Sequence, residues 1–238
     1  MTNETIMNLP QLTTAQMAEV DRLMIEVYKI SLIQMMENAG RNLADCAQNL
    51  TRNIDDPSFL LLIGSGNNGG GGLAVARHLI NRGFDVKVKL IKNQTKLKGV
   101  VKQQWEIINH MGDYITDNPS PERFDLIIDA MVGYGLKGEP KENLAAWINR
   151  INSSKRQILS LDVPSGLDAT TGIPYAACTK AAATLTLALP KRGLLTHEAK
   201  PFVGDLYLAD ISVPNHLYKT MGLDVGAIFK EGPIIKIL

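Results

Sequence analysis

The pattern of apolar and polar positions predicts two helices at the N-terminal end of the chain. Residues 12–30 carry apolar side chains at the spacing of an amphipathic helix: Met17, Val20, Met24 and Val27. Thr13 and Gln16 stand at the right separation for a capping box at its start. A second helix is predicted after Ser31, with Gln34 in the same relation. Its apolar positions are Leu32, Met35, Met36, Ala39, Leu43 and Ala47.

From residue 59 the pattern changes to short apolar runs that alternate with amphipathic segments. The run at 59–64 is continuously apolar, which is typical of a strand buried on both faces, and residues 124–132 are predicted to form another buried strand. Further strands are predicted at 85–91, 157–166, 183–190 and 204–214, and helices at 73–81, within 95–112 and at 143–152. This order predicts a three-layer α/β/α, Rossmann-like fold with a mostly parallel, doubly wound sheet and an N-terminal helical extension. Nothing resembles a linker, so one domain over residues 1–238 is expected.

Composition limits which partners and which cellular compartment are expected for this chain. Hydrophobic residues make up 45% of the 238 residues and the formal net charge is +1, which gives no general attraction to nucleic acid or to anionic membranes. No apolar run approaches the ~20 residues of a membrane span, and the N-terminus lacks the layout of a signal peptide. Cys46 and Cys178 have no CxxC partner, which favours reduced thiols and a cytoplasmic protein.

Polar or glycine-rich residues follow four of the predicted strands. They are Gly64-Ser65-Gly66-Asn67-Asn68, Asp129 with Gly133-Tyr134-Gly135, Asp162 with Pro164-Ser165-Gly166, and Pro190-Lys191. Ligands of an open parallel sheet bind outside the carboxyl ends of its strands, so these four ends predict one site. The glycine segment after residue 63 is predicted to be a loop. Its backbone N–H groups could bind a phosphate, and the N-terminus of the following helix would add a partial positive charge. Its spacing matches neither a dinucleotide fingerprint nor a P-loop, and a tight turn is nearly as good an interpretation.

The acidic and basic residues at these strand ends each allow two interpretations. Asp129 and Asp162 could be ordinary cap or turn residues. Together they also suit oxygen ligands for a cation and one acid or base. Lys191 could reach an anion or could simply be solvated. Asn67 and Asn68 add amide oxygens that coordinate cations or bind sugar hydroxyls.

Six motifs in order resemble those of the YjeF N-terminal domain family, the NAD(P)HX epimerases. They are MMENAG (from Met35), GSGNNGG, DAMVGYGLKG, SLDVPSGLDATTG, LALPKRGLL and GDLYLADISVP, and the resemblance spans roughly residues 12–215. It implies an isomerase that interconverts the R and S hydrates of NADH or NADPH, called NADHX and NADPHX, so that a separate dehydratase can repair both. It implies a small-molecule substrate and no nucleic-acid or membrane partner, and it leaves a homodimer open.

The resemblance also implies which residues bind. A potassium ion would be held by Asn68, Asp129 and Ser165. The substrate contacts would be Asn67, Asn68, Gly69, Gly70, Gly71, Gly133, Tyr134, Gly135, Leu136, Lys137, Gly138, Glu139 and Asp162. In this picture the glycines approach the dinucleotide pyrophosphate. Asp162 is the expected acid and base, because the C6 hydroxyl of the hydrate must be protonated before it departs from the ring.

One position departs from the family pattern. The family usually reads N-N-G-G-D-G, whereas this chain has Gly71 at the acidic position. Either Asp162 is sufficient for the reaction, or the chain binds the ligand and turns over poorly. A non-catalytic nucleotide-binding or scaffold module is therefore the alternative to an epimerase. Retention of Asn68, Asp129, Asp162 and Ser165 favours the enzyme. An RNA-processing scaffold is disfavoured, because the chain has no basic stripe with interleaved aromatic residues.

Overall fold

A seven-stranded sheet forms the centre of the computed structural model, which describes residues 9–238. The strand order is β2-β1-β3-β4-β5-β6-β7. The strands are β1 (Ser58–Ile63), β2 (Asp85–Leu90), β3 (Leu126–Ala130), β4 (Gln157–Leu161), β5 (Ala183–Leu187), β6 (Asp205–Ala209) and β7 (Ile234–Lys236). All neighbours are parallel except β6 and β7. Residues 1–8 lie outside the described residues. The predicted single domain over residues 1–238 and the prediction about a signal peptide both include these residues.

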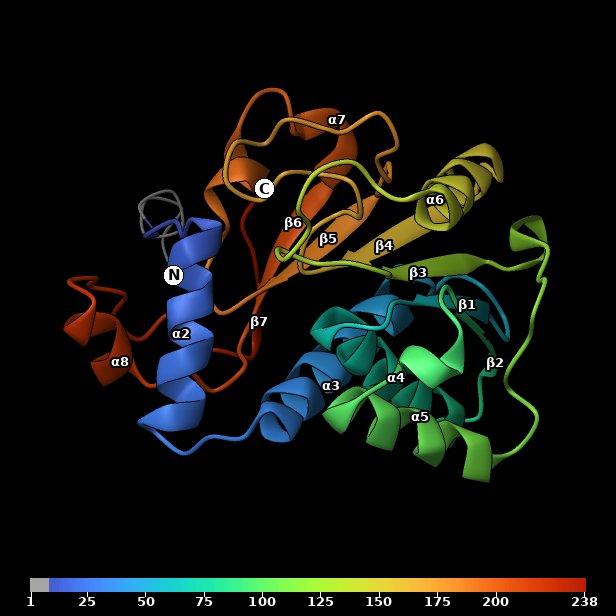
Figure 1. The fold of residues 1–238 in the computed structure, drawn as a ribbon, viewed down its shortest axis with the longest axis horizontal. Coiled ribbons are helices and arrows are strands. Elements are labelled where there is room, and N and C mark those ends of the chain that lie inside the picture. The colour runs from blue at the N-terminus through green and yellow to red at the C-terminus, as the bar shows by residue number, and fades with distance from the viewer. Residues whose placement is uncertain (1–8) are drawn as a thin grey trace.

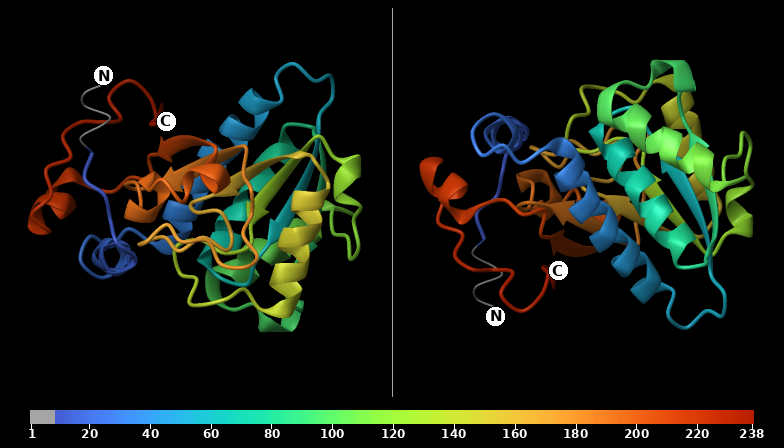
Figure 2. Two further views of the ribbon diagram at one scale, coloured as in Figure 1. Left: turned by 90° about the horizontal axis from the view of Figure 1, so that it is seen from above. Right: turned by 90° about the horizontal axis from the view of Figure 1, so that it is seen from below.

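Helices cover both faces of this sheet. They are α2 (Thr14–Glu26), α3 (Leu32–Leu50), α4 (Asn67–Asn81), α5 (Gly99–Met111), α6 (Glu142–Ser153), α7 (Lys200–Val203) and α8 (Asn215–Thr220). In Figure 1, α3, α4 and α5 lie on one side of the sheet and α6 and α7 lie on the other. The N-terminal α2 packs near α8, far from α5 and α6 in both views of Figure 2. The predicted three-layer fold with an N-terminal helical extension is confirmed.

The elements differ from the prediction mainly at their ends. Both N-terminal capping boxes are present. Val27, predicted on the buried stripe of the first helix, is instead the C-cap residue and is exposed, because α2 ends at Glu26. The strand predicted at 157–166 ends at residue 161, where the backbone turns out of the sheet. The antiparallel β7 was not predicted, since its three residues carry no pattern of their own.

Most of the glycine segment is helical and only residues 64–66 form a loop, which corrects the prediction. Helix α4 begins at Asn67, six residues before the predicted start, with Gly66 as its N-cap. A Cβ on Gly69 would lie 1.9 Å from the carbonyl oxygen of Gly64, and one on Gly72 would lie 2.4 Å from the Cβ of Ala130. The absence of side chains therefore lets the first turns of α4 pack directly on the ends of β1 and β3. Close packing accounts for these glycines.

Two further predictions concern the chain as a whole. No helix among the described residues is long and apolar enough to cross a membrane. Cys46 and Cys178 are both free and buried, and burial raises the pKa of each thiol to about 12. Both thiols are therefore protonated at neutral pH and behave as small core residues.

Candidate functional site

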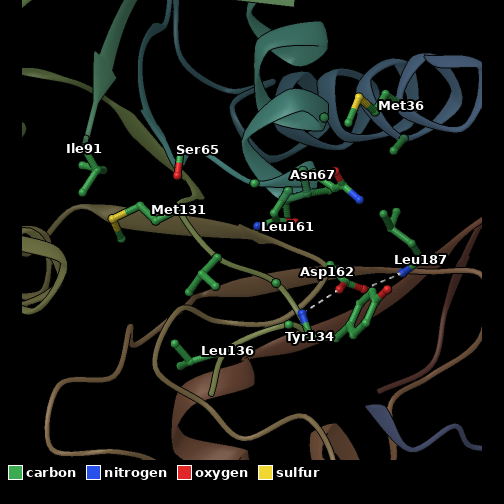
Figure 3. Close-up of a pocket in the computed structure, with 18 of the residues that line it drawn as sticks. Met36, Ser65, Asn67, Ile91, Met131, Tyr134, Leu136, Leu161, Asp162 and Leu187 are labelled. Atoms are coloured by element: carbon green, nitrogen blue, oxygen red, sulfur yellow. Dashed lines mark hydrogen bonds between the residues drawn. The ribbon is translucent and has the colours of Figure 1, made fainter. Parts of the chain in front are cut away.

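A pocket of about 510 Å³ opens at the carboxyl ends of the parallel strands. It lies where the chain order reverses between β1 and β3, the switch point at which such sheets bind ligands. Its lining combines apolar side chains with a few polar ones, as Figure 3 shows for Met36, Leu161 and Leu187 beside Asn67 and Asp162. The volume lies within the roughly 300–1,000 Å³ that is usual for small-molecule sites.

The ends of several strands contribute to this pocket. Gly64 to Asn68 follow β1, Met131 to Gly135 follow β3, and Asp162 follows β4. Ten of the thirteen predicted substrate contacts line the pocket, including Asn67, Asn68, Gly71, Gly133, Tyr134, Gly135, Leu136 and Lys137. Glu139 and Asp162 also line it, whereas Gly69, Gly70 and Gly138 do not. Gly69 and Gly70 are buried within α4, facing Gly64 and Met36.

Asp162 is held in an unusual backbone conformation at the end of β4. Its φ of 69° is in the left-handed region, which costs energy for a residue with a side chain. The carboxylate accepts hydrogen bonds from the backbone N–H groups of Tyr134 (3.2 Å) and Leu187 (3.4 Å), drawn as dashed lines in Figure 3. It also accepts from the hydroxyl of Thr186 and from Lys191. With four donors directed at it, Asp162 acts as an ionised acceptor.

Lys191 is the partner that sequence reasoning did not assign to Asp162. It is fully buried, and its Nζ forms an ion pair with Asp162 Oδ1. The same Nζ donates to the backbone carbonyl of Leu187 at 2.7 Å and to the Thr186 hydroxyl at 3.3 Å. Lys191 is therefore neither solvated nor available to a free anion, the two alternatives that the sequence left open. A buried lysine is tolerated here because all three of its contacts are electronegative oxygens.

Asp129 and Ser165 are brought together, as predicted, but below the pocket surface. Asp129 is completely buried, and Ser165 donates to it through both its hydroxyl (2.6 Å) and its backbone N–H (2.8 Å). Met131 N–H and the Ser160 hydroxyl supply two more hydrogen bonds, each 3.2 Å long. Burial raises the pKa of Asp129, and the hydrogen bonds from Ser165 oppose that shift. No ion pair among the described residues includes Asp129.

Asn68 and Asp162 both approach the backbone of Gly133. Asn68 Oδ1 lies 3.0 Å, and Asp162 Oδ2 lies 2.9 Å, from the position that a Cβ on Gly133 would take. Residue 133 must therefore be glycine for both side chains to approach its backbone. The Nδ2 of Asn68 is buried and has no hydrogen-bond partner among the described residues. A polar atom in that state indicates a ligand or water at this point of the pocket.

A second carboxylate in the pocket was missed by the sequence analysis. Asp21 of α2 lines the pocket and accepts a 2.5 Å hydrogen bond from the hydroxyl of Tyr134. Burial raises the pKa of Asp21 above its ordinary value, and the hydrogen bond from Tyr134 opposes this shift. The signal was present in the helix pattern, because Asp21 stands four residues after Met17 and three before Met24, on the apolar face.

The comparisons with known proteins agree with this geometry. The family model for the YjeF-related protein N-terminus matches residues 32–193. The chain belongs to the YjeF N-terminal family. An NAD(P)H-hydrate epimerase of Dehalogenimonas lykanthroporepellens is 40% identical over 215 residues, covering 89% of this chain and 86% of that protein. A bifunctional NAD(P)H-hydrate repair enzyme Nnr of Moorella thermoacetica is 37% identical over 87% of this chain, which spans 41% of that longer protein.

A solved structure of the same YjeF N-terminal fold extends over almost the whole chain. The crystal structure of yeast ynu0 superposes with a TM-score of 0.83, covering 96% of this chain and all of that one. At 23% sequence identity, this likeness establishes the fold alone. The pocket therefore belongs to a chain whose family and fold are both established.

The buried Lys191–Asp162 pair leads to a prediction about stability. Lys191→Met removes the cation and leaves Asp162 buried beside an apolar side chain, so the free energy of unfolding should fall by about 3–5 kcal/mol. The double variant Lys191→Met/Asp162→Asn should recover part of this loss, because no buried charge remains. Urea denaturation of the parent, both single variants and the double variant measures the coupling. Additive effects of the two substitutions would contradict a direct ion pair.

Proposed function

We propose that this protein is an NAD(P)H-hydrate epimerase, an isomerase that interconverts the R and S hydrates of NADH and NADPH for nucleotide repair. The relatives named for this activity match the chain over most of its length. The observation that carries the proposal is an ionised carboxylate, Asp162, held at the switch point of the sheet in a pocket of the size that a small ligand needs. A cytoplasmic setting is part of the proposal, because both cysteines are free thiols.

The positions of charged residues in the pocket suggest how the substrate is oriented. Lys92 and Lys141 line one side, where the side chain of Asn143 donates to the Ile91 carbonyl and holds the start of α6 beside the end of β2. Asp162 and Tyr134 line the other, as Figure 3 shows, together with Asp21, which accepts a hydrogen bond from Tyr134. The phosphates of a dinucleotide would therefore lie toward the lysines, and the hydrated nicotinamide ring toward Asp162.

The chemistry requires proton transfer at the C6 oxygen of the hydrate. When the C6 hydroxyl departs as water, the ring nitrogen supplies electrons and the ring becomes cationic. Water that adds to the other face of this cation gives the opposite configuration and must lose a proton. Asp162 accepts every hydrogen bond that it makes, which suits a base that receives this proton and a negative charge that stabilises the ring cation.

A potassium ion held by Asn68, Asp129 and Ser165 is part of the proposal. The residues fit such an ion because Asp129 is a fully buried carboxylate, and every hydrogen bond that it accepts from the described residues comes from a neutral donor. Buried charges are usually paired or bound to a metal ion, and potassium would supply the missing positive charge. When bound, it would hold the segments after β3 and β4 in place beside the nicotinamide end. Asn68 would face it through the amide oxygen.

A non-catalytic nucleotide-binding module remains the second candidate, on the ground of Gly71. This residue lines the pocket and carries no acid, unlike the family pattern. The same pocket without turnover would still bind the dinucleotide. An activity measurement separates the two candidates, and a binding measurement alone does not.

The proposed activity is tested with pure R-NADHX or R-NADPHX as substrate. We expect the protein to convert R into S, which chromatography follows over time against an enzyme-free control. Asp162→Asn keeps the shape of the side chain but cannot exchange a proton readily, so kcat should fall by about 10²–10⁴-fold with little change in KM. A parent protein that binds the dinucleotide without converting it would instead support the binding module.

The potassium site is tested by thermal unfolding in potassium chloride and in choline chloride at equal ionic strength. An ion that binds only the folded state should stabilise the parent by about 1–3 kcal/mol at saturation. Asp129→Asn should lose this difference, since it removes the formal charge from the proposed ligands. Asp113→Asn is the matched control, because the Asp113 side chain is 99% exposed. An equal potassium effect in the Asp129→Asn variant would place the ion elsewhere.

The glycine at residue 71 gives a prediction about turnover. A Cβ there would lie 3.0 Å from Cδ2 of Leu161, so a side chain fits once the flexible end of that leucine moves slightly. Gly71→Asp restores the acid of the family pattern and should raise epimerase turnover with little change in thermal stability. Gly71→Ala adds the bulk without the charge and should leave turnover unchanged. A slower Gly71→Asp variant would mean that this chain uses a different arrangement at this position.

A further inference from the structure

Tyr134 connects the two carboxylates of the pocket. Its backbone N–H donates to Asp162 Oδ2, and its phenolic hydroxyl donates to Asp21 Oδ2. Figure 3 shows the Tyr134 ring beside Asp162, inside the pocket. One oxygen of each carboxyl group is thereby fixed to an opposite end of the same tyrosine. The two groups approach the pocket from different elements, Asp21 from α2 and Asp162 from the end of β4.

The surroundings of these two carboxyl groups differ in their hydrogen bonds and charged neighbours. Asp162 accepts four hydrogen bonds, one of them from the buried Lys191. Within residues 9–238, Asp21 accepts one hydrogen bond, from Tyr134, and it lies on the apolar face of α2 between Met17 and Met24. Burial raises the pKa of Asp21, as does the negative charge of Asp162, while Lys191 acts in the opposite direction. Two carboxyl groups with such different surroundings can serve as an acid and a base.

The other charged groups of α2 do not reach this position. Arg22 forms ion pairs with Glu19 and Glu26, and all three side chains are substantially exposed. The titratable and charged groups that act on Asp21 are Tyr134, Lys191 and Asp162, which come from the segments after β3, β5 and β4. Asp21 is thus the acid that α2 presents to the pocket.

We propose that Asp21 is a second catalytic residue, the general acid that works with Asp162 as the base across the substrate ring. This inference rests on the proposed epimerase function. Inversion at C6 requires the hydroxyl to leave from one face and water to enter from the other. A single carboxylate fixed on one side serves only one of these faces. Tyr134 is a positioning residue that holds the two carboxyl groups apart and orients Asp21.

The step balances without a further reactant. Protonated Asp21 gives its proton to the C6 hydroxyl, the C–O bond breaks with its electron pair on oxygen, and water leaves while the ring nitrogen forms a C=N⁺ bond. Water then adds to C6 from the opposite face, the C=N electron pair returns to nitrogen, and Asp162 accepts the proton of the added water. One water leaves and one enters. The reverse reaction exchanges the roles, and solvent resets the protons between turnovers.

The test compares Asp21→Asn with the matched control Glu19→Gln on the exposed side of the same helix. Conversion of pure R-NADPHX into the S form gives kcat and KM, and NADPH binding is measured by its fluorescence. Asp21→Asn should lower kcat by about 10²-fold or more while KM and NADPH affinity stay close to those of the parent. Glu19→Gln should match the parent. Parent-like kcat in a folded Asp21→Asn variant overturns the inference.

A pH profile distinguishes an acid from a merely structural carboxylate. Because Asp21 must be protonated to act, kcat should fall as pH rises through its pKa. Tyr134→Phe removes the hydrogen bond that lowers this pKa, so the basic limb of the profile should move to higher pH. An unmoved limb in Tyr134→Phe contradicts the assignment, and this variant also provides the test if Asp21→Asn does not fold.

The failure of the proposed function has a different signature. If the parent binds NADPH but converts neither hydrate, the epimerase proposal fails and Asp21 has no reaction to serve. If the parent converts the R hydrate and both Asp21→Asn and Tyr134→Phe retain its kcat and its pH profile, the epimerase proposal stands and the role of Asp21 is refuted.

Discussion

The buried ion pair between Lys191 and Asp162 is the interaction on which the geometry of the site depends. It fixes the carboxylate at the end of β4, and the backbone around Lys191 also holds the N-terminal extension. Leu12 N–H donates to the Pro190 carbonyl and Arg192 N–H donates to the Leu12 carbonyl, both at 2.9 Å. Because α2 begins two residues after Leu12, the segment around Lys191 positions both Asp162 and the helix that carries Asp21.

This arrangement costs stability, which indicates that it is kept for the site. An apolar pair of similar volume is often at least as stable as a buried ion pair. Asp162 adds a left-handed backbone, a conformation that costs roughly 1–3 kcal/mol for such residues. Both features direct one carboxylate into the pocket with its hydrogen bonds already formed. A preorganised charge needs no rearrangement when a positive charge develops on the ligand, and this is how such groups accelerate reactions.

The glycine run at the start of α4 meets a second constraint, the close approach of a helix to two strand ends. Four consecutive glycines, from Gly69 to Gly72, weaken a helix by roughly 1 kcal/mol each relative to alanine. Packing against Gly64 and Ala130 offsets this cost, because a side chain at Gly69 or Gly72 would push the helix away from the sheet. The helix N-terminus consequently lies at the switch point, beside Asn68 and Asp162.

The sequence by itself determined the alternation of strands and helices, because hydrophobic periodicity reports directly which faces are buried. It also determined that polar strand ends meet at one edge, since parallel strands place all their carboxyl ends together. Only the tertiary structure decided that residues 67–72 are helical, because glycine has low helix propensity and the compensating contacts come from distant residues. It alone paired Lys191 with Asp162 and brought Asp21 to Tyr134, 113 positions away. Such pairings depend on where whole elements pack, and no local pattern of side chains encodes that position.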